Sequence, residues 1–267
     1  MGEADGSIAP MVTPESAARE LRENTTDGAA VLARRGISLL SSFVAAADDD
    51  DLSAATRRCA QRMRDARPTM AAVGNLMELW LETFAWSQED FRNRAIAHCE
   101  SILARADRAL AETVRIAHKR LGEFPRGSVL LTHSASSTVC SVIDGLPFRL
   151  LATASEPGGE GRRMAAELGI TCVEDEDAPS RVADVAAVVA GADAVARDAF
   201  ANKVGTRALA CAARESATPF FVVAESYKWV ADARPVVAED SFEAVENEFV
   251  TAFLSDRVQC VSLSPWR

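Results

Sequence analysis

Lysine is nearly absent from this sequence. Lys119, Lys203 and Lys228 are the only three among 267 residues, and arginine supplies the remaining positive charge. The formal net charge is −10 at pH 7. Affinity for a nucleic-acid backbone comes from clustered basic side chains, and no basic stripe is present, so we do not expect direct nucleic-acid binding. A GC-rich genome and a high-salt cytoplasm both fit this acidic, lysine-poor composition.

The sequence also lacks paired cysteines and long apolar runs. No C-x-x-C pair and no His/Cys cluster at zinc spacing occurs, so we expect reduced thiols, no metal and no cofactor. His98 and Cys99 are adjacent, and on a helix they would point about 100° apart. No apolar run approaches the ~18 residues of a membrane span, and no signal-peptide pattern is present. We therefore expect a cytoplasmic protein that does not contact membranes.

Residues 1–121 carry the pattern of a helical N-terminal domain. Residues 1–13 are small and polar, and Thr13 and Pro14 form a helix-start signal, with Thr13 as the cap. Apolar residues then recur at spacings of three and four. The helical segments that this spacing predicts are 27–47, 52–64, 70–84 and 88–121.

Residues 122–267 have a different pattern, which indicates a second domain. Short β-rich apolar runs alternate with alanine-rich helical segments. Connections of this length predict crossover helices and a parallel, doubly wound sheet, so the fold class is α/β with a Rossmann-like C-terminal domain. The predicted strands are 128–132, 148–153, 170–173, 185–190, 220–224 and 258–263. After Asp193, the segment at Asn202-Lys203 has the pattern of a helix start.

Polar side chains follow the predicted strands, whereas plain residues precede them. The residues that follow the strands are His133 and Ser134, Ser155 and Glu156, Asp193, and Glu225, Ser226 and Lys228. Open parallel sheets bind ligands beyond the carboxyl ends of their strands. We therefore expect the functional site at this edge, with Asp193 at its centre.

A glycine-rich segment, Gly158–Gly161, precedes Arg162. It fits either a phosphate-binding loop at a helix N-terminus or a flexible turn. The spacing does not match G-x-G-x-x-G, and no acidic residue is placed to bind a ribose.

Several motifs together resemble the initiation factor 2B alpha/beta/delta family, which includes the methylthioribose-1-phosphate and ribose-1,5-bisphosphate isomerases. The motifs are Arg67-Pro68-Thr69, Thr132-His133-Ser134, Gly161-Arg162, Gly191-Ala192-Asp193, Asn202-Lys203-Val204-Gly205-Thr206 and the segment 219–228. Their order and spacing carry the resemblance across most of the chain. It implies a helical N-terminal domain, a Rossmann-like C-terminal domain and association into dimers or larger assemblies.

The resemblance also implies which residues form the site. In the isomerases, a cysteine after the threonine-histidine pair and the aspartate of Gly-Ala-Asp move protons between two sugar carbons. Here these positions are Ser134 and Asp193. A serine hydroxyl is a far weaker acid than a thiol and needs a partner base. The positions implied to bind ligand are Gly28, Arg67, His133, Arg162, Asn202, Lys203, Glu225 and Lys228.

Two departures concern phosphate binding. Asp27 and Glu156 stand where the isomerases favour arginine, and carboxylates there should disfavour a bisphosphate. Arg67, Arg162 and Lys203 still suffice for one phosphate.

Each site residue also has a structural interpretation. Asp193 and Ser134 can act as helix caps, His133 can orient a loop through hydrogen bonds, and Glu225 can be an ordinary carboxylate at a strand end.

Two functions remain open. The first is a noncatalytic or regulatory subunit-like protein that binds a phosphorylated sugar or nucleotide and acts as a homodimer, as a larger assembly or with another family subunit. The second is an aldose–ketose isomerase of a sugar phosphate such as ribose 1,5-bisphosphate. In it, Asp193 is the base and Ser134 or a water is the acid. The serine favours the first, because losing a matched acid costs orders of magnitude in rate.

Overall fold

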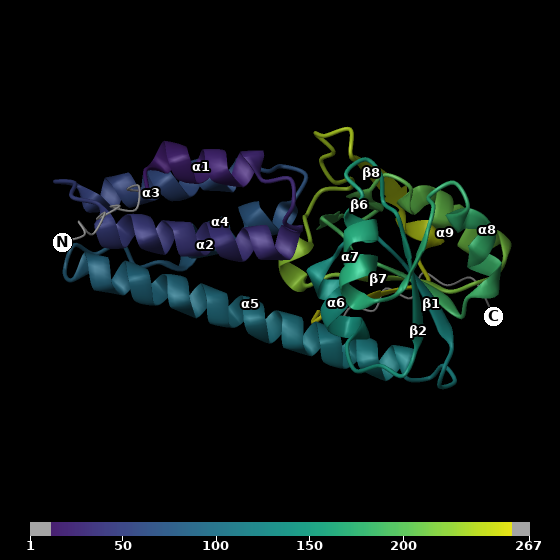
Figure 1. The fold of residues 1–267 in the computed structure, drawn as a ribbon. Helices are drawn as coiled ribbons and strands as arrows, with labels where there is room; N and C mark the ends of the chain where they lie inside the picture. The colour runs from purple at the N-terminus through teal and green to yellow at the C-terminus, as the bar shows by residue number, and fades with distance from the viewer. Residues whose placement is uncertain (1–11, 258–267) are drawn as a thin grey trace, which may run out of the picture.

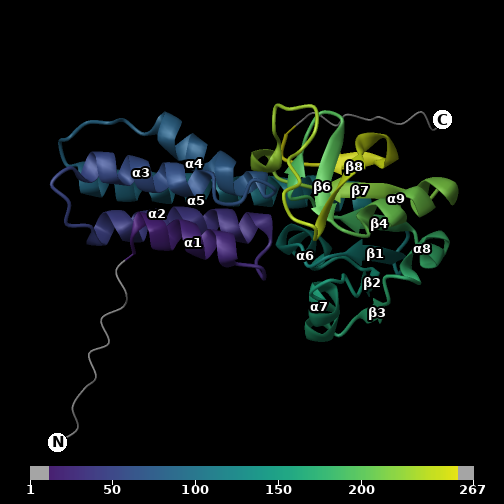
Figure 2. The same ribbon diagram turned by 90° about the horizontal axis from the view of Figure 1, so that it is seen from above.

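A computed structural model describes residues 12–257. Most of the predicted tail, residues 1–11, and the predicted strand 258–263 lie outside the described residues. The chain forms a helical region beside a region built on a parallel sheet, and the long helix α5 (Phe91–Leu121) runs along both (Figures 1 and 2). This arrangement confirms the predicted α/β class.

The helical region consists of α5 and four shorter helices: α1 (Pro14–Glu23), α2 (Ala29–Ala46), α3 (Leu52–Arg64) and α4 (Ala71–Thr83). The hydroxyl of Thr13 accepts a hydrogen bond from the backbone N–H of Ser16, as expected of a cap before Pro14. The fifth helix begins at Phe91 rather than near Gln88, because Asp90 takes a left-handed conformation with φ of 46°.

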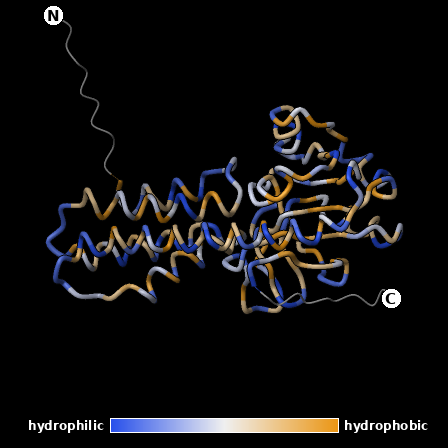
Figure 3. Tube along the Cα trace, turned by 90° about the horizontal axis from the view of Figure 1, so that it is seen from below, coloured by the Kyte–Doolittle hydropathy of each residue, from blue (hydrophilic) through white to orange (hydrophobic). Residues whose placement is uncertain are grey.

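Apolar and polar positions alternate along these helices (Figure 3), and the apolar faces meet in one core around the fully buried Trp80. Phe84 stacks on Trp80 at 4.8 Å between ring centroids. Helix α2 is long and apolar enough to cross a membrane by length and composition alone. Half of it is buried in this core, and Arg34 and Arg35 interrupt it, so its apolar face is a packing surface.

The sheet has the order β3-β2-β1-β4-β7-β9, and every neighbouring pair in the described residues is parallel. Its strands are β1 (Val129–His133), β2 (Arg149–Thr153), β3 (Thr171–Val173), β4 (Ala187–Ala190), β7 (Phe220–Val223) and β9 (Ala252–Leu254). Five of the predicted strands thus match. Strand β9 was not predicted.

Helices cover both faces of the sheet. Strand β7 illustrates the reason, because it has apolar side chains on both faces. Phe220 and Val222 pack on one face with α8 (Ala178–Arg181) and α9 (Thr206–Glu215). Phe221 and Val223 pack on the opposite face with the end of α5 and with α6 (Ser137–Ile143). Such a doubly buried strand reads as a continuous apolar run. Helix α7 (Glu160–Leu168) packs against β2 and β3.

A second, antiparallel sheet was not predicted. It has the order β5-β6-β8, from β5 (Ala194–Val195), β6 (Ala199–Lys203) and β8 (Phe242–Glu246). The expected helix start at Asn202-Lys203 is therefore wrong: both residues end strand β6, and α9 begins at Thr206. Short 3-10 turns complete the chain at η1 (Val182–Asp184), η2 (Ser226–Lys228) and η3 (Asn247–Phe249).

Candidate functional site

The site lies where the sheet changes direction. The chain leaves β1 toward β2 on one side, and β4 pairs with β1 on the other, which makes their carboxyl ends the topological switch point. Ser134 follows β1, and Gly191-Ala192-Asp193 follows β4. A Cβ atom at Gly191 would lie 2.6 Å from the Ser136 hydroxyl, so this turn requires glycine.

Asp193 lies deep in the site, between the sheet and the helical region. Its backbone carbonyl accepts a hydrogen bond from Ala71 N–H at 3.0 Å, which ties it to the start of α4. The side chain is partly buried and has no hydrogen-bond partner among residues 12–257, so it is not a helix cap. Burial raises the pKa of its carboxyl to about 6, although the positive charges of Lys228 and Arg67 oppose this rise. A carboxylate of this kind exchanges protons near neutral pH.

Arg67 lies beside Asp193 and is 4% exposed. Its guanidinium donates to both oxygens of Glu239, at 3.2 Å from Nε and 3.0 Å from Nη2, and to the backbone carbonyl of Asn24. The neighbouring Ala238 N–H donates to the hydroxyl of Thr69 at 3.0 Å. Glu239 and Ala238 therefore hold the loop before β8 against Arg67 and Thr69. Both carboxylate oxygens of Glu239 occupy the face of the guanidinium that could otherwise bind an anion.

Lys228 also acts on Asp193, and it forms a buried pair with Glu225. The ammonium lies 3.0 Å from Glu225 Oε2, and the two side chains are 3% and 0% exposed. Thr138 and Tyr227 donate their hydroxyls to Glu225 Oε1 at 2.8 and 3.1 Å. Burial alone would raise the pKa of Glu225, but the Lys228 charge and the Thr138 hydroxyl hold it below its usual value.

Ser134, Glu160 and Lys203 form a connected group on the opposite side of the site. The Ser134 hydroxyl donates to Glu160 Oε1 at 3.2 Å, and its backbone N–H donates to the Ser155 hydroxyl at 2.8 Å. Lys203 lies 3.0 Å from the same Glu160 oxygen and also donates to the carbonyl of Pro157. The N-terminal cap of α6 is Ser136, so Ser134 does not cap that helix.

His133 and Asn202 are held by fixed hydrogen bonds. His133 Nε2 donates to the Val204 carbonyl at 2.9 Å, so Nδ1 accepts from the Thr153 hydroxyl at 2.6 Å. Burial lowers the pKa of this histidine, which keeps the ring neutral. Asn202 Nδ2 donates to the Thr206 hydroxyl at 2.9 Å and so steadies the turn into α9.

Gly28 and Arg162, which the family resemblance implies bind ligand, are arranged differently from the residues around Asp193. Gly28 is the N-cap of α2 and lies near the loop after β1, where a Cβ atom would be 3.8 Å from the Ala135 carbonyl. Arg162 is half exposed and forms a bidentate pair with Glu174, with both contacts at 2.8 Å. Within residues 12–257, its guanidinium has no contact with Asp193 or Lys203.

The glycine-rich segment 158–161 is a tight turn into α7. Gly158 and Gly159 have φ of 107° and 60°. A Cβ atom at Gly161 would lie 2.1 Å from the Thr153 carbonyl, so only glycine allows α7 to approach β2 this closely. Glu160 occupies the first turn of α7, where a helix favours a negative charge.

Glu160 and Glu239 are the two carboxylates that sequence reasoning missed. Glu160 is visible in the sequence as an acidic residue at a helix start beside the glycines. Glu239 lies in a loop and has no local signal. The structure connects Arg67 to it across 172 positions in sequence.

The chain matches the model of the initiation factor 2 subunit family over residues 25–263. A protein of Pyrococcus abyssi described as translation initiation factor eIF-2B subunit 2-like is 31% identical over 261 residues, which cover 93% of this chain and 89% of the relative. The ribose 1,5-bisphosphate isomerase of Archaeoglobus fulgidus is 30% identical over 224 residues, covering 80% of this chain and 71% of the enzyme.

Solved structures agree in fold. The translation initiation factor eIF-2B of Pyrococcus horikoshii superposes with a TM-score of 0.78 at 24% identity, covering 94% of this chain and 97% of that chain. The 5-methylthioribose 1-phosphate isomerase of the same organism gives 0.71 at 20% identity, covering 92% and 83%. Factors and isomerases therefore share this fold, and fold alone does not separate them. The chain belongs to the initiation factor 2 subunit family.

Proposed function

We propose that this chain is a noncatalytic, eIF-2B subunit-like member of the family that binds a small molecule with one phosphate group and acts as part of an assembly. One observation carries the proposal: the cations implied to bind phosphate already have carboxylate partners. Arg67 pairs with Glu239, and Lys203 pairs with Glu160. Because a carboxylate already balances the charge of each of these cations, the site does not have enough free positive charge to bind two phosphates.

The charge balance supports a single phosphate. Glu239 is 35% exposed and belongs to a loop, so an incoming phosphate can displace it from the buried Arg67 fork. Lys203 and Glu160 are only 8% and 19% exposed, and Glu160 also holds Ser134. That pair is harder to open, because separating buried charges leaves each one unsolvated.

The position of the isomerases' cysteine supports the absence of turnover. Ser134 has no unpaired carboxylate beside it to act as a base, because the one carboxylate that it contacts among residues 12–257, Glu160, is ion-paired with Lys203. A serine hydroxyl without an activating base does not exchange protons usefully at neutral pH. Asp193 is therefore left without its proton-transfer partner.

The proposal that this chain acts as part of an oligomer rests on similar proteins. A solved neighbour is described as a tetrameric eIF2B-beta2-delta2 complex of C. thermophilum, with a TM-score of 0.67. We infer a homodimer, a larger assembly or association with another family subunit. We also infer a cytoplasmic location without direct contact to nucleic acid or membranes.

Calorimetric titration tests the binding claim. Ribose 5-phosphate should bind at Arg67, and ribose 1,5-bisphosphate should bind there no more than about threefold tighter, because no second cation beside Asp193 is free of a carboxylate partner. Arg67→Met should abolish binding of both ligands at this site, whereas the surface variant Arg64→Met should bind normally. A bisphosphate that binds about a hundredfold tighter than the monophosphate would overturn the single-phosphate site.

A second candidate is sugar-phosphate isomerisation, which the state of Asp193 favours. Its carboxyl has a pKa of about 6 and no hydrogen-bond partner among the described residues, as a general base requires. In that case a water would serve as the acid. Asp193→Asn should then abolish conversion and leave ribose 5-phosphate binding within about twofold. Equal rates for the two proteins would exclude this function.

A further inference from the structure

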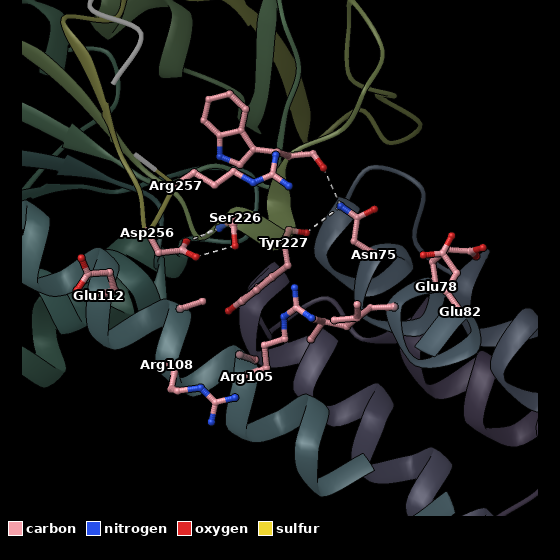
Figure 4. A pocket seen from close by; sticks show the side chains of 15 residues that line it. Asn75, Glu78, Glu82, Arg105, Arg108, Glu112, Ser226, Tyr227, Asp256 and Arg257 are labelled. Carbon is pink, nitrogen blue, oxygen red and sulfur yellow. Dashed lines mark hydrogen bonds between the residues drawn. The ribbon is translucent and has the colours of Figure 1, made fainter. Parts of the chain in front are cut away.

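A cavity lies between the helical region and the sheet region, at a different place from Asp193. Its volume is about 530 Å³, and its walls come from α4, α5, η2 and the segment after β9 (Figure 4). This volume lies within the range of small-molecule sites. Asn75 connects α4 to the segment at η2, since its amide donates hydrogen bonds to the backbone carbonyls of Tyr227 and Trp229, both at 2.9 Å.

Three arginines line this cavity: Arg105 and Arg108 from α5, and Arg257 after β9. Figure 4 shows Arg105 and Arg257 on opposite sides of Tyr227, with Arg108 farther along α5. Their guanidiniums form no ion pair or hydrogen bond with another residue between 12 and 257. This contrasts with the cations around Asp193, which all have carboxylate partners.

The carboxylates of the cavity wall do not neutralise these arginines. Glu78 pairs with Arg64 at 2.9 Å, and Glu112 pairs with Arg115 at 2.6 Å. Glu82 is the one glutamate of this wall without such a partner in the described part of the chain.

Asp256, the remaining acidic residue of the wall, is also engaged. Its two oxygens accept from the backbone N–H and the hydroxyl of Ser226, at 2.6 and 2.7 Å. This carboxylate therefore holds the turn after β7 in place. The cavity wall thus has three exposed guanidiniums without an ion-pair partner in residues 12–257, against two carboxylates, Glu82 and Asp256, that also lack one.

We propose that this cavity is a second anion site, which binds a phosphorylated small molecule. A guanidinium binds phosphate through two parallel hydrogen bonds, and arginines on two walls can hold two phosphoryl groups or one group from both sides. The site does not depend on phosphate binding at Asp193. It shares Tyr227 with that site, because the Tyr227 hydroxyl donates to Glu225, the partner of Lys228.

Titration of the full chain with inorganic pyrophosphate tests this site. We expect saturable binding, weakened about tenfold or more, or 1.4 kcal/mol, in the double variant Arg105→Ser/Arg257→Ser. The matched control Arg126→Ser/Arg149→Ser removes two exposed arginines elsewhere and should bind within about twofold of the wild type. Arg67→Met should also retain the binding.

Three results would overturn the proposal. They are the absence of saturable binding below about 1 mM, an equal loss in the control double variant, and loss in Arg67→Met alone. The last result would place the anion at the Asp193 site. Conversely, if Arg67→Met abolishes ribose 5-phosphate binding while pyrophosphate still binds, both sites exist and are separate.

Discussion

The two sides of the site at the carboxyl ends of β1 and β4 differ in how their polar groups are satisfied. On the β4 side, Asp193 has no hydrogen-bond partner in residues 12–257, and its carboxyl pKa is raised to about 6. On the β1 side, Ser134, Glu160 and Lys203 hold one another in a closed group. The first arrangement suits proton exchange, and the second suits a fixed scaffold.

The two sides of one site therefore differ in the chemistry that their side chains allow. The glycine turns that place Asp193 and α7 fix the backbone on both sides. Reactivity depends on single side chains at those places. Four variants test the contrast between the two sides, beginning with the largest expected effect.

Lys228→Met should destabilise the fold most. It leaves Glu225 fully buried without its ammonium partner, which costs about 3–5 kcal/mol in free energy of unfolding. Urea denaturation at pH 7.5 measures the loss. Lys119→Met, at the exposed lysine, should change stability by less than about 0.5 kcal/mol. The double variant Lys228→Met/Glu225→Gln should recover most of the loss, and a failure to recover would contradict the charge argument.

Asp193→Asn should stabilise the protein at neutral pH. The folded-state pKa of Asp193, about 6, is raised above the ordinary value of 3.8, so its protonated form contributes its full stability below pH 4. That stability is lost as pH rises through 6. The variant should therefore exceed the wild type by roughly 2–3 kcal/mol at pH 7.5 and equal it near pH 4. Urea titrations at both pH values measure this, with the exposed Asp198→Asn as control. A pH-independent difference would show that Asp193 is not destabilised by ionisation.

Glu239→Gln should strengthen phosphate binding. The change removes the carboxylate that competes for Arg67, and we expect ribose 5-phosphate to bind about tenfold tighter, or 1.4 kcal/mol. Calorimetry measures the change, and the neighbouring exposed Asp240→Asn is the control. Unchanged or weaker binding would mean that Arg67 is not the phosphate ligand.

Ser134→Ala should have the smallest effect. It removes one partly exposed hydrogen bond to Glu160 and should cost about 0.5–1 kcal/mol in unfolding free energy. Ribose 5-phosphate affinity should stay within about twofold. Ser136→Ala removes the cap of α6 and should cost about 1 kcal/mol, which provides a comparison of known origin. A large loss of binding in Ser134→Ala would assign the serine a direct ligand contact.

Local sequence patterns were sufficient for five of the six described strands of the parallel sheet and for one edge of the site. The apolar runs that became β1, β4 and β7 are continuous because both faces are buried, and the residues after them, such as Ser134 and Asp193, lie together because parallel strands end at one edge. These features could be predicted because they depend on residues that are close together in the sequence.

The ion pairs could not be predicted in the same way. Lys203 and Glu160 are 43 positions apart, and Arg67 and Glu239 are 172 apart, so only the tertiary fold brings them together. The antiparallel sheet escaped prediction for a related reason. Asn202 and Lys203 look like a helix start, but pairing with the distant β8 holds them in a strand.

Conversion of ribose 1,5-bisphosphate, followed by ¹³C NMR at pH 7.5, tests the central claim most directly. The wild type, Asp193→Asn and a protein-free blank should be compared at equal substrate. We predict the same rate for all three, because Ser134 supplies no acid on the β1 side. A ketose product that forms with the wild type and not with Asp193→Asn would contradict this and establish an isomerase.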